Sequence, residues 1–370
     1  MYLSPYLFLF TLLITLAEAG SHLWEVRSVS AETSGIHHGK RAVSIKPGEN
    51  PDGNGATRVW PKKTLTYAFV DDDAAEKLRP IIFQARQYWS QLDIHGFKYK
   101  EITLDRCNLD RDECLLVHYN DRGYRSTTPG RPPLESKTGY VGPNMYLSDN
   151  PKVGNLDANL NVAHEIGHPW GLMHEHQKDI HWEVSDMTQE GWNVQIVNEN
   201  RDIQFETDDF RCRNLKDYEE AFQKIDERAK EPEEAADDKK LLCRTWSTAK
   251  KYGFSGAEWL PMKTDKLDAD PAFDPVSLML YPSNAGGIGE VNGADDDQRL
   301  PILTYRNGDR IPIRTGASVA DIDKLISIYG DKYKGVSNLL NSKDNYFRRT
   351  FRKVRSTLSL KGGDTNDGVC

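Results

Sequence analysis

The spacing of apolar residues predicts both strands and helices over residues 58–120. Residues 64–69 alternate between polar and apolar positions, as expected of a β-strand whose successive side chains point to opposite faces. From residue 74 to residue 92 the apolar residues recur every three or four positions, which is the spacing of one helix face. The segments 97–102 and 114–119 predict two further strands. This part of the chain is therefore expected to form a sheet with a core-facing helix.

The later part of the chain is more helical. Residues 214–242 form an acidic, helix-favouring block with Glu and Lys four positions apart, which predicts a solvated helical insert within residues 178–272. A surface for a partner protein is the alternative interpretation of this block. Ser318 to Asp321 form a helix N-cap pattern, and the apolar residues that follow, up to Tyr329, fall on one face. The mixture of strands and helices indicates an α+β fold.

The first 19 residues have the features of a secretory signal. An apolar run over residues 7–16 precedes Ala17-Glu18-Ala19, a small-x-small cleavage site. A run of about ten residues is too short for a permanent membrane span. An uncleaved anchor is the alternative, because no Lys or Arg precedes the run. The chain is therefore predicted to be secreted, with residues 1–19 removed.

The rest of the chain divides into four segments. Residues 20–41 end in Lys40-Arg41, a dibasic pair of the kind that processing proteases cleave, and we interpret them as a propeptide; an exposed basic linker is the alternative. Residues 42–57 are rich in Gly, Pro and Asn and predict a flexible lead-in to a main domain over residues 58–335. Residues 336–370 form a basic tail, predicted to be a disordered or helical appendage rather than a binder of polyanions.

Composition argues against two classes of protein, the nucleic-acid binders and the multi-span membrane proteins. The 370 residues carry a formal net charge of -8, which does not favour a nucleic-acid binder, and a mean hydropathy of -0.66 argues against a multi-span membrane protein. Secretion makes disulfides available, and the five cysteines permit several pairings. We expect Cys107 to pair with Cys114 and Cys212 with Cys243, which leaves Cys370 over.

The most specific chemical signal is the stretch from His164 to His174. Residues four apart share one face of a helix, so His164 and His168 can offer two imidazole nitrogens to one Zn²⁺ at roughly 2.0–2.1 Å. Glu165 is too short to be a third ligand there, but it can reach a water at the metal as a general base. Gly171 accepts the positive φ that ends a helix and would turn His174 back to the metal. Three histidines with an open position are the catalytic pattern of zinc.

Pro169 follows the second histidine and changes the expected course of this helix. Its ring removes a backbone N–H and clashes with the preceding turn, so the helix is expected to kink or to end early. The alternative to a metal site as a whole is an amphipathic helix whose histidines lie on the surface.

The spacing H-E-x-x-H-x-x-G-x-x-H resembles the signature of the metzincin metalloproteases, and Glu175 after the third histidine makes it similar to the astacin family. The segment from Ser277 to Tyr281 matches that family's S-x-M-x-Y turn. The resemblance implies a zincin-like catalytic domain with a mixed twisted sheet, an active-site helix and a Met-turn. It further implies that Met279 forms the hydrophobic floor beneath the zinc and that Tyr281 is a swinging fifth ligand and oxyanion donor.

We also expect specific roles for two segments and for the N-terminus of the mature chain. Residues 144–148 resemble the family's edge strand, which lies antiparallel to a bound peptide. Residues 123–139, rich in Pro, Gly, Ser and Thr, are expected to form a surface loop at the rim of the cleft. The family buries the N-terminus made by propeptide cleavage against the glutamate after the third histidine. The ammonium of Ala42 is therefore expected to pair with Glu175.

Together these residues predict a secreted zinc endopeptidase, a monomer with one catalytic zinc ion, a protein or peptide substrate, no nucleic-acid partner and no membrane span. Glu165 and zinc would activate water for attack on the scissile carbonyl, and Glu165 would pass the proton to the leaving amine. Tyr281 would stabilise the oxyanion. The alternatives are a secreted non-catalytic binding protein on a protease fold and a zinc hydrolase of non-peptide amides.

Cleavage after Arg41 is tested by N-terminal sequencing of the secreted protein. We expect the mature chain to begin at Ala42, because the dibasic pair directly precedes it. A secreted protein that begins at Gly20 would show that residues 20–41 are retained, and it would contradict the pairing of Ala42 with Glu175.

Overall fold

The computed structural model of the chain describes residues 42–45, 57–132, 142–183, 202–262, 267–269, 272–293 and 296–330. The predicted signal segment 1–19, propeptide 20–41 and basic tail 336–370, which includes Cys370, lie outside these ranges. Within them, no helix has both the length and the apolar character of a membrane span.

A mixed five-stranded sheet carries the first half of the described chain. Its strands are β2 (Thr64–Phe69), β3 (Lys98–Glu101), β4 (Leu115–Tyr119), β5 (Ser126–Thr127) and β6 (Asn144–Leu147). They lie in the order β3-β2-β4-β6-β5, and all neighbours are parallel except β5, which runs antiparallel to β6. The strands predicted within 64–69, 97–102 and 114–119 are confirmed. The described residues also form three two-stranded pairs: β1 (Val43–Ile45) with β9 (Leu267–Ala269), β7 (Trp182–Glu183) with β8 (Phe205–Glu206), and β10 (Val291–Gly293) with β11 (Asp296–Asp297).

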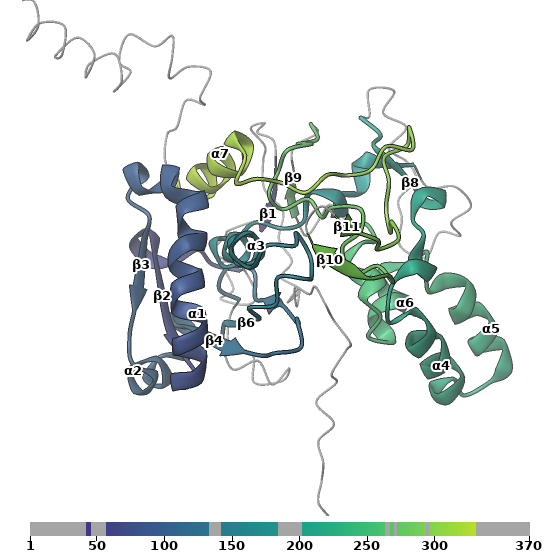
Figure 1. Cartoon of the computed structure of the whole chain (residues 1–370), viewed down its shortest axis with the longest axis horizontal. Coiled ribbons are helices and arrows are strands. Elements are labelled where there is room, and N and C mark those ends of the chain that lie inside the picture. The colour runs from purple at the N-terminus through teal and green to yellow at the C-terminus, as the bar shows by residue number, and fades with distance from the viewer. Residues whose placement is uncertain are drawn as a thin grey trace, which may run out of the picture.

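Two helices build the main core against this sheet. α1 (Asp72–Ala85) begins at the N-cap Asp71 and is continued by a 3₁₀ segment over Arg86–His95, so the predicted helix over 74–92 is confirmed with a more tightly wound second part. α3 (Ala158–Trp170) packs against α1, and Figure 1 shows both helices beside the strands. The apolar side chains buried among these elements include Leu78, Trp89, Phe97, Leu115, Met145, Ile166 and Trp170.

The outer strand on the β6 side of the sheet is β5. β6 lies between β4 and β5, with Leu116 opposite Asn144 and Ser126 opposite Tyr146. The expectation that residues 144–148 form the edge strand is therefore wrong. A two-residue strand in a segment rich in Pro, Gly, Ser and Thr leaves no periodic signal, so the sequence did not reveal that β6 is covered.

Residues 123–132 also differ from the expected surface loop, because all of them except Tyr124 are buried. The N–H of Gly130 donates to the His168 carbonyl (2.9 Å), and Arg131 Nε donates to the Asp112 carbonyl (2.8 Å). These bonds hold the segment against the core, so the expectation of a rim loop is wrong for this part. The remaining positions, 133–139, lie outside the described ranges.

The start of the described chain is a strand. β1 (Val43–Ile45) pairs antiparallel with β9 (Leu267–Ala269), and the Ile45 N–H donates to the Gly171 carbonyl (2.8 Å). The expectation of a flexible lead-in over 42–57 is therefore wrong at its first residues, whereas residues 46–56 lie outside the described ranges. The strand depends on partners far away along the chain, which local composition cannot reveal.

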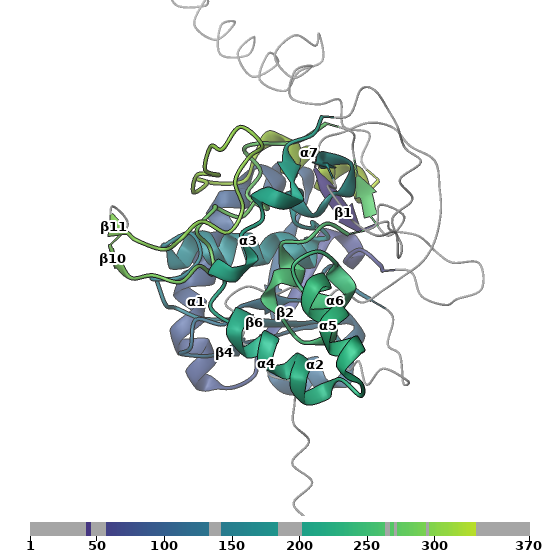
Figure 2. The same cartoon turned by 90° about the vertical axis from the view of Figure 1, so that its right-hand side faces the viewer.

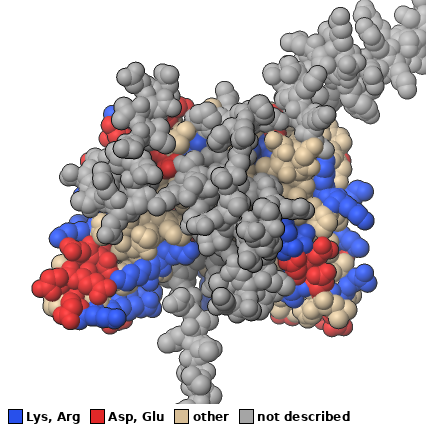
Figure 3. Space-filling view, turned by 180° about the vertical axis from the view of Figure 1, so that it is seen from behind, with Lys and Arg blue, Asp and Glu red and all other residues tan. Residues whose placement is uncertain are grey.

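The predicted helical insert contains α4 (Tyr218–Arg228), α5 (Pro232–Leu241) and α6 (Trp246–Lys251). Figures 1 and 2 show these helices together on the side of the molecule away from β2 and β3. α5 has no buried residue, and Asp and Glu side chains gather beside Lys and Arg over this corner in Figure 3, as expected of a solvated insert. α4 differs, because Ala221 and Ile225 are buried in a second core that includes Tyr281.

Both expected disulfides are present. Cys107 lies in α2 (Leu104–Leu109) and pairs with Cys114 at a Cα–Cα distance of 5.4 Å. Cys212 pairs with Cys243 at a Cα–Cα distance of 5.7 Å and joins the two ends of the α4–α5 segment. These pairs are compatible with an extracellular protein.

α7 (Val319–Ile328) closes the main core and holds the turn that precedes Met279. Ser318 Oγ accepts a hydrogen bond from the Asp321 N–H (2.9 Å), and the Asp321 carboxylate accepts one from the Ser318 N–H (2.9 Å), so the predicted cap is confirmed as a capping box. The same carboxylate accepts hydrogen bonds from Ser277 Oγ (2.7 Å) and the Leu278 N–H (2.8 Å). The start of this helix therefore fixes the position of the turn.

Ser318→Ala tests this connection. The variant loses the N-cap and is expected to lower the free energy of unfolding by about 1–2 kcal/mol, measured by urea denaturation. Ser327→Ala changes an exposed position of the same helix and serves as the matched control, with an expected change within about 0.5 kcal/mol. Equal stability of the two variants would contradict the role given to the cap.

Candidate metal centre

α3 presents two of the predicted ligands, and its end presents the third. The helix begins at Asp157, whose carboxylate accepts a hydrogen bond from the Leu160 N–H (2.8 Å), and it ends at Gly171 with φ 112°. The expectation that Pro169 kinks the helix or ends it early is wrong in its second part, because the helix runs on to Trp170. Pro169 has no N–H to donate to the carbonyl four residues earlier, and the helix ends one residue after it. Gly171 then supplies the left-handed turn that sends the chain back toward the helix.

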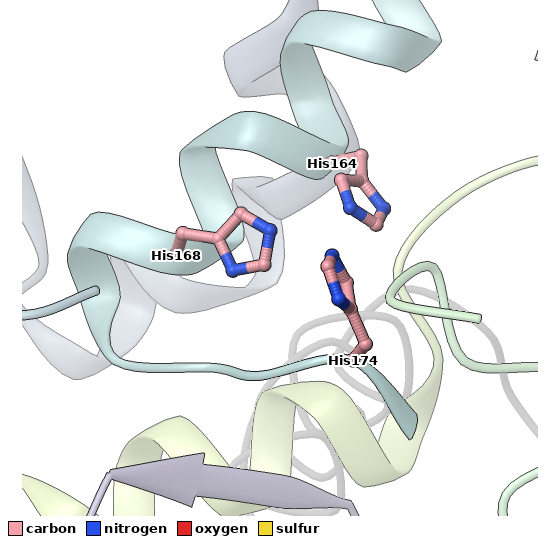
Figure 4. A group of neighbouring side chains, drawn as sticks. All are labelled: His164, His168 and His174. Atoms are coloured by element: carbon pink, nitrogen blue, oxygen red, sulfur yellow. The ribbon is translucent and has the colours of Figure 1, made fainter. Parts of the chain in front are cut away.

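His164, His168 and His174 converge in the interior (Figure 4), and all three are buried. One ring nitrogen from each lies within 4.8 Å of the others, which makes the three residues a group able to hold a metal ion. The ring centroids are 5.0 Å apart for His164 and His168, 4.9 Å for His168 and His174, and 5.3 Å for His164 and His174.

The hydrogen bonds of the three rings decide which nitrogen faces the centre. His164 Nδ1 lies 2.8 Å from the Leu278 carbonyl, and His168 Nδ1 lies 2.9 Å from the Leu172 carbonyl. A carbonyl oxygen only accepts, so both Nδ1 atoms carry the proton and both Nε2 atoms keep a lone pair. His174 Nδ1 lies 2.7 Å from Gln177 Oε1 and has the same tautomer. Nε2 is therefore the metal-facing atom of each ring.

Two further observations fit a bound cation. The Nε2 atoms of His168 and His174 are buried and accept no hydrogen bond from the part of the chain that the structure describes, which is costly unless another group occupies the centre. Burial lowers the pKa of His164 to about 4 and, together with the neighbouring imidazoles, lowers the pKa of His168 and His174 well below the usual value. The rings are therefore neutral at pH 7, as metal ligands must be. Three neutral imidazoles are a ligand set that suits zinc.

Met279 lies against α3 at Gly167. A Cβ atom added to Gly167 would meet Met279 Sδ at 2.5 Å and the Trp89 ring at 3.2 Å, so only glycine leaves space for the thioether there. Gly167 directly precedes His168 in the helix. The methionine therefore packs next to the histidine pair, in the part of the molecule where the sequence expects the floor of the site.

Glu165 is buried, and its carboxylate Oε2 accepts a hydrogen bond of 2.6 Å from Thr127 Oγ1. Burial raises the pKa of Glu165 to about 8, although the Thr127 bond and the charge of Arg125 lower it. A cation at the histidine group would lower the pKa of this carboxyl further, because an opposite charge nearby favours the ionised form.

Tyr281 and Glu175 lie on the side of the centre that faces the second core. The Tyr281 ring centroid is 4.3 Å from that of His174 and 5.3 Å from that of His164. Glu175 is buried; its Oε1 accepts a hydrogen bond from the Asp274 N–H (2.9 Å), whereas no described residue donates to Oε2. Burial raises the pKa of Glu175 to about 8. The structure thus brings Tyr281 next to two rings of the histidine group, whereas the roles expected of Tyr281 and Glu175 stay predictions.

Sequence reasoning missed two residues of the site. Thr127 lies on β5 and contacts Glu165, but nothing in a segment rich in Ser, Thr and Gly marks one hydroxyl as special. Gln177 contacts the third histidine from three positions further along the chain. Its place in the run His174-Glu175-His176-Gln177 is the signal that could have found it.

Known proteins give little help in identifying this site. No family model matches the chain, and no curated protein matches its sequence. A solved structure described as the crystal structure of myroilysin aligns with a TM-score of 0.31 and 14% sequence identity, covering 83% of this chain and 99% of that one. A likeness at this score supports no conclusion, so the site depends on its own residues.

The metal-binding role of the histidine group is tested by metal analysis. We expect the protein purified from zinc-containing medium to hold about one zinc ion per chain and His164→Ala to hold almost none, because two imidazoles bind the ion far more weakly than three. His118→Ala is the matched control, since His118 lies on β4 outside the group, and it should keep the ion. Zinc content unchanged in His164→Ala would contradict the site.

Proposed function

We propose that the chain is a zinc-dependent endopeptidase of the astacin-like metzincin type, which hydrolyses internal peptide bonds. The observation that carries this proposal is the convergence of three neutral, buried imidazoles next to a buried glutamate from the same helix. When bound, zinc at such a group supplies a Lewis acid that polarises a carbonyl and lowers the pKa of water.

In the proposed reaction Glu165 is the general base. Its carboxylate takes a proton from the attacking water and later gives that proton to the leaving amine, so the carboxylate is regenerated in each turnover. The Thr127 hydroxyl holds one carboxylate oxygen at 2.6 Å and so restricts the orientation of the base. Tyr281, whose ring packs on His174, is proposed to donate its hydroxyl proton to the oxyanion that forms at the scissile carbonyl.

The proposed substrate is an extended peptide that pairs with the outer strand β5. A peptide that adds to a sheet edge gains backbone hydrogen bonds, whatever its sequence. β5 is the outer strand on its side of the sheet, and its residue Thr127 contacts Glu165, so a peptide paired there would run past the base. Because Ser126 and Thr127 are buried, this pairing requires the residues that cover β5 to move aside. This assigns to β5 the role that the sequence had given to residues 144–148.

Secretion and activation by cleavage after Arg41 belong to the same proposal. Two disulfides fit an oxidising compartment. The Val43 carbonyl accepts a hydrogen bond from the Met173 N–H (2.9 Å). Ala42, the residue before Val43, therefore lies near the segment that leads to Glu175. An ammonium group on Ala42 would offer a partner to the buried Glu175 Oε2, which makes a pairing of these two groups reasonable.

Glu165→Gln separates catalysis from metal binding. The amide cannot act as a base, so we expect the variant to bind zinc like the wild type and to cleave casein at least about 100-fold more slowly. Glu76→Gln, at an exposed position of α1, is the matched control and should keep full activity. Wild-type rates in Glu165→Gln would refute the role of the base. A wild-type chain that binds zinc but cleaves neither casein nor gelatin would favour the non-catalytic alternative.

A further inference from the structure

We propose that Gln177 is a positioning residue through which the insert orients the third metal ligand. The inference depends on metal binding by the three histidines, and it assigns to the insert segment 255–262 a structural role in the metal site. The chain of contacts runs from Ser255 through Gln177 to His174.

Both the oxygen and the nitrogen of the Gln177 side-chain amide form hydrogen bonds. Its Oε1 accepts the Nδ1 proton of His174 at 2.7 Å, and its Nε2 donates to the carbonyls of Ala257 (2.9 Å) and Leu260 (3.2 Å). Two carbonyl acceptors identify the amide nitrogen, so the orientation of the amide group follows from its contacts. Gln177 is 2% exposed, and little water competes with these bonds.

The backbone holds Gln177 against the same segment. The N–H of Met262 donates to the Gln177 carbonyl at 2.8 Å, and Lys178 and Met262 form a parallel bridge. The other end of the segment is fixed by Asp217, whose carboxylate accepts hydrogen bonds from the Ser255 N–H (2.7 Å) and Ser255 Oγ (2.6 Å). Asp217 is the N-cap of α4, so the position of Gln177 is tied to the helices of the insert.

The third histidine needs such a contact more than the other two. His164 and His168 are held by α3 itself, and their Nδ1 atoms donate to backbone carbonyls at Leu278 and Leu172. His174 lies beyond the helix end, and its Nδ1 donates to a side chain instead. A hydrogen bond to the second ring nitrogen fixes the tautomer and orientation of a histidine ligand and raises its basicity, typically by enough to change metal affinity about 10–100-fold.

The test compares zinc affinity among three variants by competition with a chromophoric chelator. Gln177→Met keeps the size of the side chain but removes the acceptor, so we expect zinc to bind at least about 10-fold more weakly than in the wild type. Gln177→Glu keeps an acceptor for His174 Nδ1 and is expected to bind zinc within about threefold of the wild type. Gln298→Met, on a segment outside the metal site, is the matched control and should leave affinity unchanged.

The outcomes separate the possible failures. A wild-type chain that binds no zinc would remove the proposed function itself, and the inference with it. Zinc binding of wild-type strength in Gln177→Met would overturn the inference alone. Equal losses in Gln177→Met and Gln177→Glu would also overturn it, because an acceptor for His174 Nδ1 would then make no difference to zinc binding. Cobalt-substituted protein gives an independent measure, since a reoriented His174 should change the visible absorption spectrum of Gln177→Met but not of Gln177→Glu.

Discussion

The arrangement of three neutral imidazoles in a buried space is the constraint on which the candidate site depends. Each ring donates its Nδ1 proton to an oxygen, and the Nε2 lone pairs are left to face one another. Among the described residues nothing donates to the buried Nε2 atoms of His168 and His174, which costs free energy, and protonation cannot relieve the cost because burial lowers the pKa of both rings. A divalent cation would accept a lone pair from each of the three rings. Metal binding is therefore expected to stabilise the fold as well as to enable chemistry.

Separate parts of the chain supply the oxygens that orient the rings. The Leu278 carbonyl belongs to the turn held by Asp321 of α7, and the Leu172 carbonyl follows the end of α3. The third oxygen comes from Gln177, which is held by the insert. The site therefore lies where the sheet domain, the C-terminal helix and the insert meet. The insert is part of the structure around the histidine group and not only a solvated addition.

Local signals in the sequence were sufficient to predict the strand at 64–69, the helix over 74–92 and the group of three histidines. The alternation at 64–69 and the three-to-four spacing over 74–92 each depend on a face buried within one element, which a sequence displays directly. The metal group could be predicted because its first two ligands share a helix face and the third follows a glycine with positive φ. These features need only short-range geometry.

What the sequence could not reveal depends on contacts between distant segments. Val43–Ile45 is a strand because Leu267–Ala269 pairs with it, and residues 123–132 are buried because they bond to α3 and to Asp112. Pro169 was expected to kink the helix or end it early, but the helix continues to Trp170 and ends at Gly171, whose positive φ turns the chain. Thr127 acts through one hydrogen bond, for which residue type gives no pattern, and Gln177 depends on contacts with Ala257 and Leu260 about eighty residues away.

The central claim is that His164, His168 and His174 bind one zinc ion through Nε2, and X-ray absorption at the zinc edge tests it most directly. The protein purified without chelators should show three imidazole scatterers and one oxygen at roughly 2.0–2.1 Å, in a four-coordinate shell. A spectrum with sulfur ligands, with fewer than three imidazoles, or with the six oxygen ligands of a loosely held ion would contradict the account.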